Sequence, residues 1–154
     1  MKQYEEKLKN YITAHNIQAE QLIFTKPCHT VKEAADAAGV SPEDLVKNIC
    51  MIDGKGNLIV AIVKGEDRAS TSRVGKALQT DKPRIAGESE VLEKTGYPVG
   101  GVPSFGYEAT FLVDPKVLEK EIVYTGGGST HSLVRIASRE LLRVNKATVA
   151  RIRK

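Results

Sequence analysis

The sequence contains no tryptophan, only two cysteines, and no apolar run approaching the length of a membrane span. A helix that crosses a bilayer needs about 20 mostly apolar residues, so we do not expect a membrane protein. The first residues are charged and lack the apolar stretch of a secretory signal, which makes the cytoplasm the expected location. Cys28 and Cys50 lie far apart in the sequence and do not have the spacing of metal ligands. The sequence neither requires nor excludes a disulfide between them.

The excess of positive over negative charge is also small. The chain has 23 lysines and arginines against 19 acidic residues, a net charge of +4 at pH 7. This mild basicity permits contact with a polyanion, whereas a dedicated duplex-binding protein usually has a denser basic stripe. The longest basic concentration, Arg143 to Lys154, is interrupted by apolar residues and is typical of a solvated surface.

Common catalytic signatures are missing too. The sequence has no phosphate-binding loop, no helix with paired metal-binding histidines and no glycine–serine nucleophile elbow. The histidines His15, His29 and His131 are scattered. Cys28 and His29 are adjacent, and neighbours in an extended segment point to opposite sides, which disfavours a nucleophile pair. We therefore expect no metal and no other cofactor.

Apolar periodicity predicts one domain of mixed secondary structure. Residues 3–15 have helical spacing, and Thr30-Val31-Lys32-Glu33 is a capping box that begins a helix ending at Gly39. Apolar runs at 49–52 and 58–63 flank a glycine-rich turn and predict a hairpin whose second strand is covered on both faces. Further strands are expected at 22–25, 84–86, 109–113, 121–125 and 133–136, and helices at 71–78, 89–95 and 139–143, the last capped by Ser138, while 147–152 is ambiguous.

These elements do not alternate as regular β-α-β units. We therefore predict that residues 1–154 form a single α+β domain with a mixed β-sheet or irregular barrel flanked by helices. A chain of this length buries roughly two-thirds of its unfolded surface, which is enough for a core without disulfides.

One lysine lies at the rim of an apolar strand. Lys47 follows a short predicted helix and shares a strand face with Ile49 and Met51. Its ammonium can meet a phosphate or a carbonyl oxygen. The simpler alternative is a lysine that buries its stem and extends its charge into water, and the spacing alone favours that alternative.

Two segments are rich in glycine. Residues 96–106 contain four glycines and two prolines, a composition that specifies backbone shape and lets amide groups approach a ligand. Residues 125–131 combine three glycines with hydroxyls and His131. Each segment is either part of a binding cleft or a structural connection.

Taken in order, these segments resemble the YbaK/ProX family of aminoacyl-tRNA deacylases, a module that is also inserted in some prolyl-tRNA synthetases as an editing domain. The resemblance runs from about Thr30 to Leu142. The matching pieces are Val31–Ala35 with Gly39, Leu45-Val46-Lys47, Thr95–Gly106, Phe111–Asp114 and Gly126–His131.

The resemblance implies a trans-editing hydrolase that removes alanine or cysteine from mischarged proline tRNA. Aminoacyl-tRNA is then the partner, and an aminoacyl-tRNA synthetase is a further candidate partner. Water would attack the ester while backbone amides of the glycine loop stabilise the oxyanion, with Lys47 near the phosphate or the ester. The implied catalytic residue is Lys47, and the implied substrate-binding residues are Thr30, Gly100, Gly101, Val102, Pro103, Ser104, Gly127, Gly128 and His131.

Two other functions stay open. Pro103 stands one residue earlier than the loop proline of many family members, which motivates a non-catalytic module of the same fold that binds tRNA or a synthetase. The other is a hydrolase of a small nucleotide ester or amide.

Overall fold

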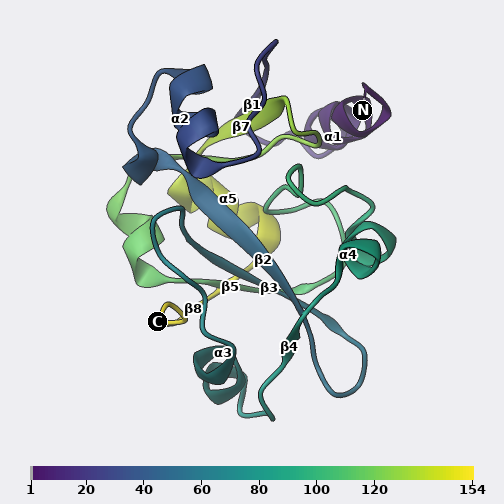
Figure 1. Cartoon of the computed structure of the whole chain (residues 1–154), viewed down its shortest axis with the longest axis vertical. Helices are drawn as coiled ribbons and strands as arrows, with labels where there is room; N and C mark the ends of the chain where they lie inside the picture. Colours follow the sequence, from purple (N-terminus) through teal and green to yellow (C-terminus); the bar gives the residue numbers. More distant parts are fainter. Residues whose placement is uncertain (1) are drawn as a thin grey trace.

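The computed structural model describes residues 2–154 as an α+β fold with two β-sheets (Figure 1). The smaller sheet is antiparallel and has the order β1-β7-β6, and the larger has the order β4-β2-β3-β5-β8. In the larger sheet β2 pairs antiparallel with β3 and β4, whereas β5 pairs parallel with β3 and β8, so this sheet is mixed. The strands are β1 (Ala19–Ile23), β2 (Val46–Ile52), β3 (Leu58–Lys64), β4 (Arg84–Ile85), β5 (Thr110–Val113), β6 (Ile122–Gly126), β7 (Ser132–Ala137) and β8 (Thr148–Val149).

Helices surround both sheets. In Figure 1, α1 and α2 lie beside the smaller sheet, α4 lies at one side of β2, α3 lies below the larger sheet and α5 lies behind β2. The predicted α+β class with a mixed sheet flanked by helices is confirmed. The helices are α1 (Lys2–Ala14), α2 (Val31–Ala38), α3 (Thr71–Leu78), α4 (Glu88–Thr95) and α5 (Ser138–Asn145), with short 3-10 turns η1 (Pro42–Asp44) and η2 (Pro115–Glu119).

The capping prediction for α2 is confirmed in detail. The Thr30 side chain accepts from the Glu33 amide, the Glu33 carboxylate accepts from the Thr30 amide, and Gly39 ends the helix with φ 69°. At α5 the prediction was wrong, because Ser138 is the first helical residue and Ala137 occupies the cap position without a side-chain hydrogen bond. The Ser138 amide instead donates to the Glu121 carbonyl.

The strand β3 is buried along its whole length, as the sequence predicts. Val60 and Ile62 pack into the main core, which lies between the two sheets and also contains Leu8, Tyr97 and Phe105. The alternate residues of β3 pack on the opposite face of the sheet with Val74 of α3 and Ile152. A single bridge between Leu45 and Tyr124 brings the start of β2 beside β6, which positions the two sheets around one core.

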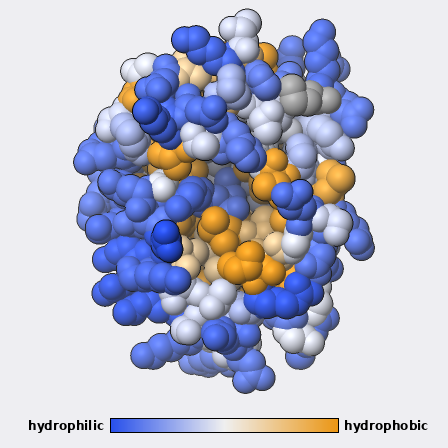
Figure 2. Space-filling model, viewed as in Figure 1, coloured by the Kyte–Doolittle hydropathy of each residue, from blue (hydrophilic) through white to orange (hydrophobic). Residues whose placement is uncertain are grey.

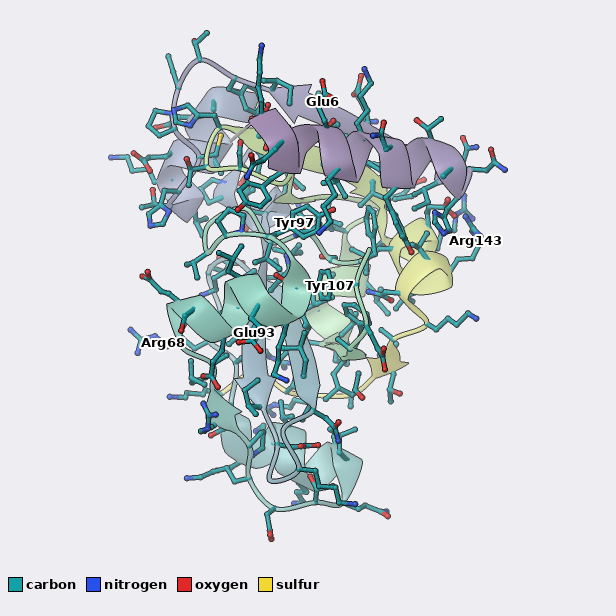
Figure 3. The ribbon with its side chains drawn as sticks, turned by 90° about the vertical axis from the view of Figure 1, so that its right-hand side faces the viewer. Glu6, Arg68, Glu93, Tyr97, Tyr107 and Arg143 are labelled. Carbon is teal, nitrogen blue, oxygen red and sulfur yellow. The ribbon has the colours of Figure 1, made fainter. Side chains whose placement is uncertain are left out.

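Two tyrosines lie in the interior between α1 and α4 (Figure 3). The ring centroids of Tyr97 and Tyr107 are 6.4 Å apart, and the Tyr107 hydroxyl donates to the Pro103 carbonyl at 2.6 Å. These contacts fix the segment between α4 and β5 against the main core.

The ambiguous segment near the end of the sequence becomes ordered through Asp114. Its carboxylate, which is fully buried, accepts hydrogen bonds from the amides of Ile152 and Arg153 and pairs with the Arg153 guanidinium at 2.8 Å. Residues 148–149 then form β8 at the edge of the larger sheet. Among residues 2–154, no helix is both long enough and apolar enough to cross a bilayer.

Candidate functional site

A cavity of about 430 Å³ opens between α2, β2, the start of α4 and the loop that follows α4. Figure 2 shows apolar side chains gathered around a hollow on the face seen in Figure 1. Volumes of this size suit small ligands. The polar lining comes from His29, Thr30, Lys47, Asn48, Glu88 and Thr125, and much of the apolar lining comes from Leu45, Val46, Cys50, Ala86, Val91, Val99 and Val102.

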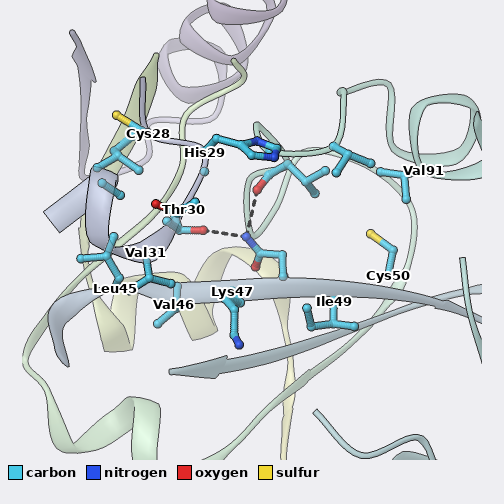
Figure 4. Close-up of a pocket in the computed structure, with 18 of the residues that line it drawn as sticks. Cys28, His29, Thr30, Val31, Leu45, Val46, Lys47, Ile49, Cys50 and Val91 are labelled. Carbon is cyan, nitrogen blue, oxygen red and sulfur yellow. Dashed lines mark hydrogen bonds between the residues drawn. The ribbon is translucent and has the colours of Figure 1, made fainter. Parts of the chain in front are cut away.

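The alternation of β2 separates Lys47 from its neighbour Asn48. As predicted, Lys47 shares a face with Ile49 and Met51, and Met51 is buried in the second core cluster. Figure 4 shows the Lys47 side chain leaving β2 on the side away from His29 and Thr30. Lys47 therefore lies at the edge of the cavity, with its ammonium directed away from the glycine–proline loop.

Burial and the neighbouring Arg68 lower the pKa of the Lys47 ammonium, and the Asp67 carboxylate partly opposes this shift. Arg68 is exposed, so Lys47 has a second basic group beside it at the surface. Such a pair suits a solvent-exposed phosphate better than a buried carbonyl oxygen, because two cations repel each other unless an anion lies between them.

Asn48 is the polar side chain of β2 that reaches into the cavity. Its Nδ2 donates to the Val102 carbonyl at 2.9 Å and to the Thr125 hydroxyl at 2.8 Å, while its Oδ1 accepts from the Ser104 hydroxyl at 2.6 Å. The Ser104 and Thr125 hydroxyls lie 2.7 Å apart, and Asn145 donates to the Ser104 carbonyl. The side-chain amide of Asn48 thus joins β2, β6 and the glycine–proline loop.

The two glycine-rich segments pack against each other and form one wall of the cavity. The Gly128 amide donates to the Gly101 carbonyl at 2.8 Å, and a Cβ on Gly101 would lie 2.6 Å from the Gly128 backbone. Gly100 adopts φ +91°, and a Cβ there would lie 2.6 Å from Nδ1 of His29. Close backbone contact at these positions requires glycine.

Two amides of this wall are available to a ligand. The Gly101 amide donates to the Pro98 carbonyl at 3.0 Å, which makes it unavailable. Within residues 2–154, the amides of Gly100 and Val102 form no hydrogen bond, and both residues line the cavity. Paired backbone donors of this kind stabilise an oxyanion.

The structure brings four of the predicted site residues to the cavity surface: Thr30, Lys47, Gly100 and Val102. Ser104 lies behind the wall with its hydroxyl bonded to Asn48. Pro103, Gly101, Gly127 and Gly128 are buried and give the wall its shape. The His131 ring lies 3.1 Å from the Thr130 hydroxyl and does not line the cavity.

Sequence reasoning missed His29, Asn48, Thr125 and the cavity position of Cys50. Strand alternation was the available signal for Asn48 and Cys50, because both lie on the face opposite Lys47. Both cysteines are free, so the disulfide does not form. Burial raises the pKa of the Cys50 thiol to about 11, so this thiol stays protonated near neutral pH and is a poor nucleophile.

Comparisons with known proteins agree with this geometry. The pattern of the family described as aminoacyl-tRNA editing domain matches residues 25–144. The uncharacterized protein YwhH of Bacillus subtilis strain 168 is 26% identical over 136 residues, which cover 87% of this chain and 86% of that protein. The proline–tRNA ligase of Kosmotoga olearia is 32% identical over 104 residues, which cover 64% of this chain but 18% of the ligase.

Solved structures show the same fold. The structure of the hypothetical protein APE2540 has a TM-score of 0.88 and 33% identity, and the match covers 96% of this chain and 99% of that one. The structure of a candidate trans-editing enzyme for prolyl-tRNA synthetase has a TM-score of 0.90 and 25% identity, with 98% and 97% covered.

Proposed function

Because this chain belongs to the aminoacyl-tRNA editing domain family, we propose that it is a free-standing deacylase of mischarged tRNA. The proposed reaction is hydrolysis of the ester that joins an amino acid to the terminal ribose, and the proposed substrate is proline tRNA charged with alanine or cysteine. The proposal places this activity in the cytoplasm, with aminoacyl-tRNA as the partner and an aminoacyl-tRNA synthetase as a second one.

The observation that carries the proposal is a small, largely apolar cavity with two unpaired amides in its wall. The cavity of about 430 Å³ is large enough for a short side chain and its ester. The amides of Gly100 and Val102 supply donors where the ester oxygen develops negative charge. An aminoacyl ester is already activated, so correct placement of water and of these donors is sufficient.

In the proposed step, water forms a bond to the ester carbonyl carbon and loses a proton as the carbonyl electron pair moves to oxygen. The resulting oxyanion accepts hydrogen bonds from the wall. Its collapse breaks the bond to the ribose oxygen, which takes up a proton, and the free amino acid leaves. The Asn48 network keeps the wall in the shape that this step needs.

Lys47 has an electrostatic role in this proposal. Its ammonium points away from the wall, which favours a contact with tRNA phosphate over a contact with the ester. Arg68 is exposed on the same side and supplies a second charge. Weak phosphate contacts of this kind would give tRNA binding that depends on salt.

Cavity size would decide which amino acid is removed. Val91, Val102 and Cys50 leave space for a short side chain among apolar atoms. Discrimination by shape has a limit, because one methylene group changes binding by about 1–3 kcal/mol. Alanine and cysteine are therefore expected to react with rates closer to each other than to that of proline.

The test is release of free amino acid from alanyl, cysteinyl and seryl tRNAs by the purified protein, with prolyl-tRNA as the reference. We expect release from the mischarged tRNAs and little from prolyl-tRNA. No release from any aminoacyl-tRNA would exclude the proposed activity. The position of Pro103 motivates one alternative, a module that only binds tRNA, and salt-dependent binding without turnover would support it.

A further inference from the structure

His29 stands where two hollows on the surface meet. It lines the deep cavity and also a shallower neighbour formed with Ser89, Leu92 and Pro98. Glu88 and Val99 are the other residues shared by the two hollows. Figure 4 shows the His29 ring above β2, on the side of the cavity. Any ligand that occupies both hollows must pass this imidazole.

The backbone on both sides of His29 is anchored, while the ring nitrogens stay available. The Cys28 amide donates to the Thr130 carbonyl at 2.5 Å, and Thr30 caps α2, so the residues on both sides of His29 are anchored. The ring packs on Gly100, where the missing side chain leaves room for Nδ1. His29 is exposed, and within residues 2–154 neither ring nitrogen forms a hydrogen bond.

The position of the ring matters if the proposed function holds, and the inference rests on that function. With the amino acid in the deep cavity and the terminal nucleoside on the shallower hollow, the ester lies at their junction. Gly100, whose amide forms no hydrogen bond within residues 2–154, lies at this junction too, and its Cα packs beside the ring. We propose that His29 is a catalytic residue, the general base that activates the attacking water.

A ring nitrogen of neutral His29 takes a proton from water while the water oxygen bonds to the ester carbon. The carbonyl electron pair moves to oxygen, and the amides of Gly100 and Val102 donate hydrogen bonds to the resulting oxyanion. When the intermediate collapses, the protonated ring returns its proton to the leaving ribose oxygen, and the imidazole is neutral again. No other reactant is consumed.

The ionisable groups on the surrounding elements are compatible with this role. Glu88 of α4 is the acidic residue that lines both hollows together with the ring. Glu33 of α2 is engaged by the Thr30 amide, and burial raises the pKa of the Cys28 thiol, so that thiol stays protonated. The remaining neighbours are Lys47, which points away from the cavity, and His131, which lies beside Thr130.

The experiment compares His29→Ala, His29→Gln and His29→Phe with the unmodified full chain on the mischarged tRNA that the full chain cleaves fastest. His15→Ala is the matched control, because His15 is exposed, lines neither hollow, and contacts Tyr11. Rates are measured from pH 5 to 8, the range in which histidine changes its charge. Thermal unfolding checks that each variant is folded.

We expect all three His29 variants to lose about 100-fold or more in kcat with little change in KM, since general bases contribute on the order of 10²–10⁴-fold. The fall in rate toward pH 5 should disappear, and added imidazole should restore part of the activity of His29→Ala. A full rate and an unchanged pH profile in His29→Phe would overturn the inference and assign the ring to stacking. Failure of the unmodified chain on every aminoacyl-tRNA is a different result, which rejects the proposed function itself.

Discussion

The Ser104 hydroxyl donates a 2.6 Å hydrogen bond to Oδ1 of Asn48 and thereby joins the glycine–proline loop to β2. The same Asn48 amide donates to the Val102 carbonyl, so a single side chain holds two points of the loop. The amides of Gly100 and Val102 belong to this loop, so their direction depends on a residue that does not supply them.

Replacing Asn48 by alanine should weaken both the wall and the activity. The change removes three hydrogen bonds and leaves the buried hydroxyls of Ser104 and Thr125 with fewer partners, which costs about 1–3 kcal/mol in the free energy of unfolding. Deacylation should fall more than stability alone explains, and kcat should fall more than affinity for tRNA. Chemical denaturation and single-turnover deacylation measure the two effects. Asn57→Ala, in an exposed turn, is the control, and equal deacylation by both variants would contradict this role.

Gly100→Ala should reduce activity without unfolding the protein. A side chain at φ +91° is strained by about 1–3 kcal/mol, and the new Cβ would displace the His29 ring, which is exposed and able to move. Gly54→Ala is the matched control, since a Cβ there meets nothing within 4 Å. Melting temperature and deacylation rate separate the effects. Full activity in Gly100→Ala would show that neither the position of His29 nor the direction of the Gly100 amide matters.

Removing the charges at the edge of the cavity should weaken tRNA binding in a salt-dependent way. For Lys47→Met and Arg68→Gln we expect KM for aminoacyl-tRNA to rise roughly 2- to 5-fold at low salt, as is usual for loss of one exposed charge contact. The difference should shrink as salt increases. Lys55→Met, in the exposed turn between β2 and β3, should behave like the unmodified chain. A loss of kcat at unchanged KM in Lys47→Met would instead place that ammonium at the ester.

Asp114→Asn should destabilise the fold near neutral pH but not in acid. Burial alone would raise the pKa of the Asp114 carboxyl, but hydrogen bonds from the amides of Lys116, Ile152 and Arg153 and from the Arg153 side chain outweigh burial, and the net shift is downward. A carboxyl with a lowered pKa in the folded state contributes stability above its unfolded-state pKa and loses that contribution as pH falls through its folded-state pKa.

The expected loss in Asp114→Asn at pH 7 is about 2 kcal/mol in the free energy of unfolding. The difference from the unmodified chain should shrink below about pH 4, where the unfolded-state carboxyl becomes protonated. Urea unfolding at several pH values measures it, with Asp81→Asn, an exposed position, as the control. A difference that stays constant down to pH 3 would show that the charge of Asp114 is not what stabilises the end of the chain.

Local patterns were sufficient for much of the secondary structure. The start and end of α2 followed from a capping box and a glycine, and the burial of β3 on both faces followed from its uninterrupted apolar run. The strand predicted at 84–86 is observed as β4, whereas β8 was not predicted, because a strand of two residues has too little periodicity to be recognised. β8 in particular depends on Asp114, which lies more than thirty residues earlier in the chain.

The sequence predicted which segments contribute to the candidate site but not how they lie relative to one another. The sequence alone determined that two glycine-rich segments and a lysine at the start of a strand were available, and that Lys47 faces the same way as Ile49. Only the tertiary structure decided that this direction leads away from the glycine wall, and that Asn48 and His29 face the cavity in its place. The physical reason is that strand alternation and glycine torsions are local, whereas the contact of His29 with Gly100 joins residues 71 positions apart and forms only once both sheets have closed around the core.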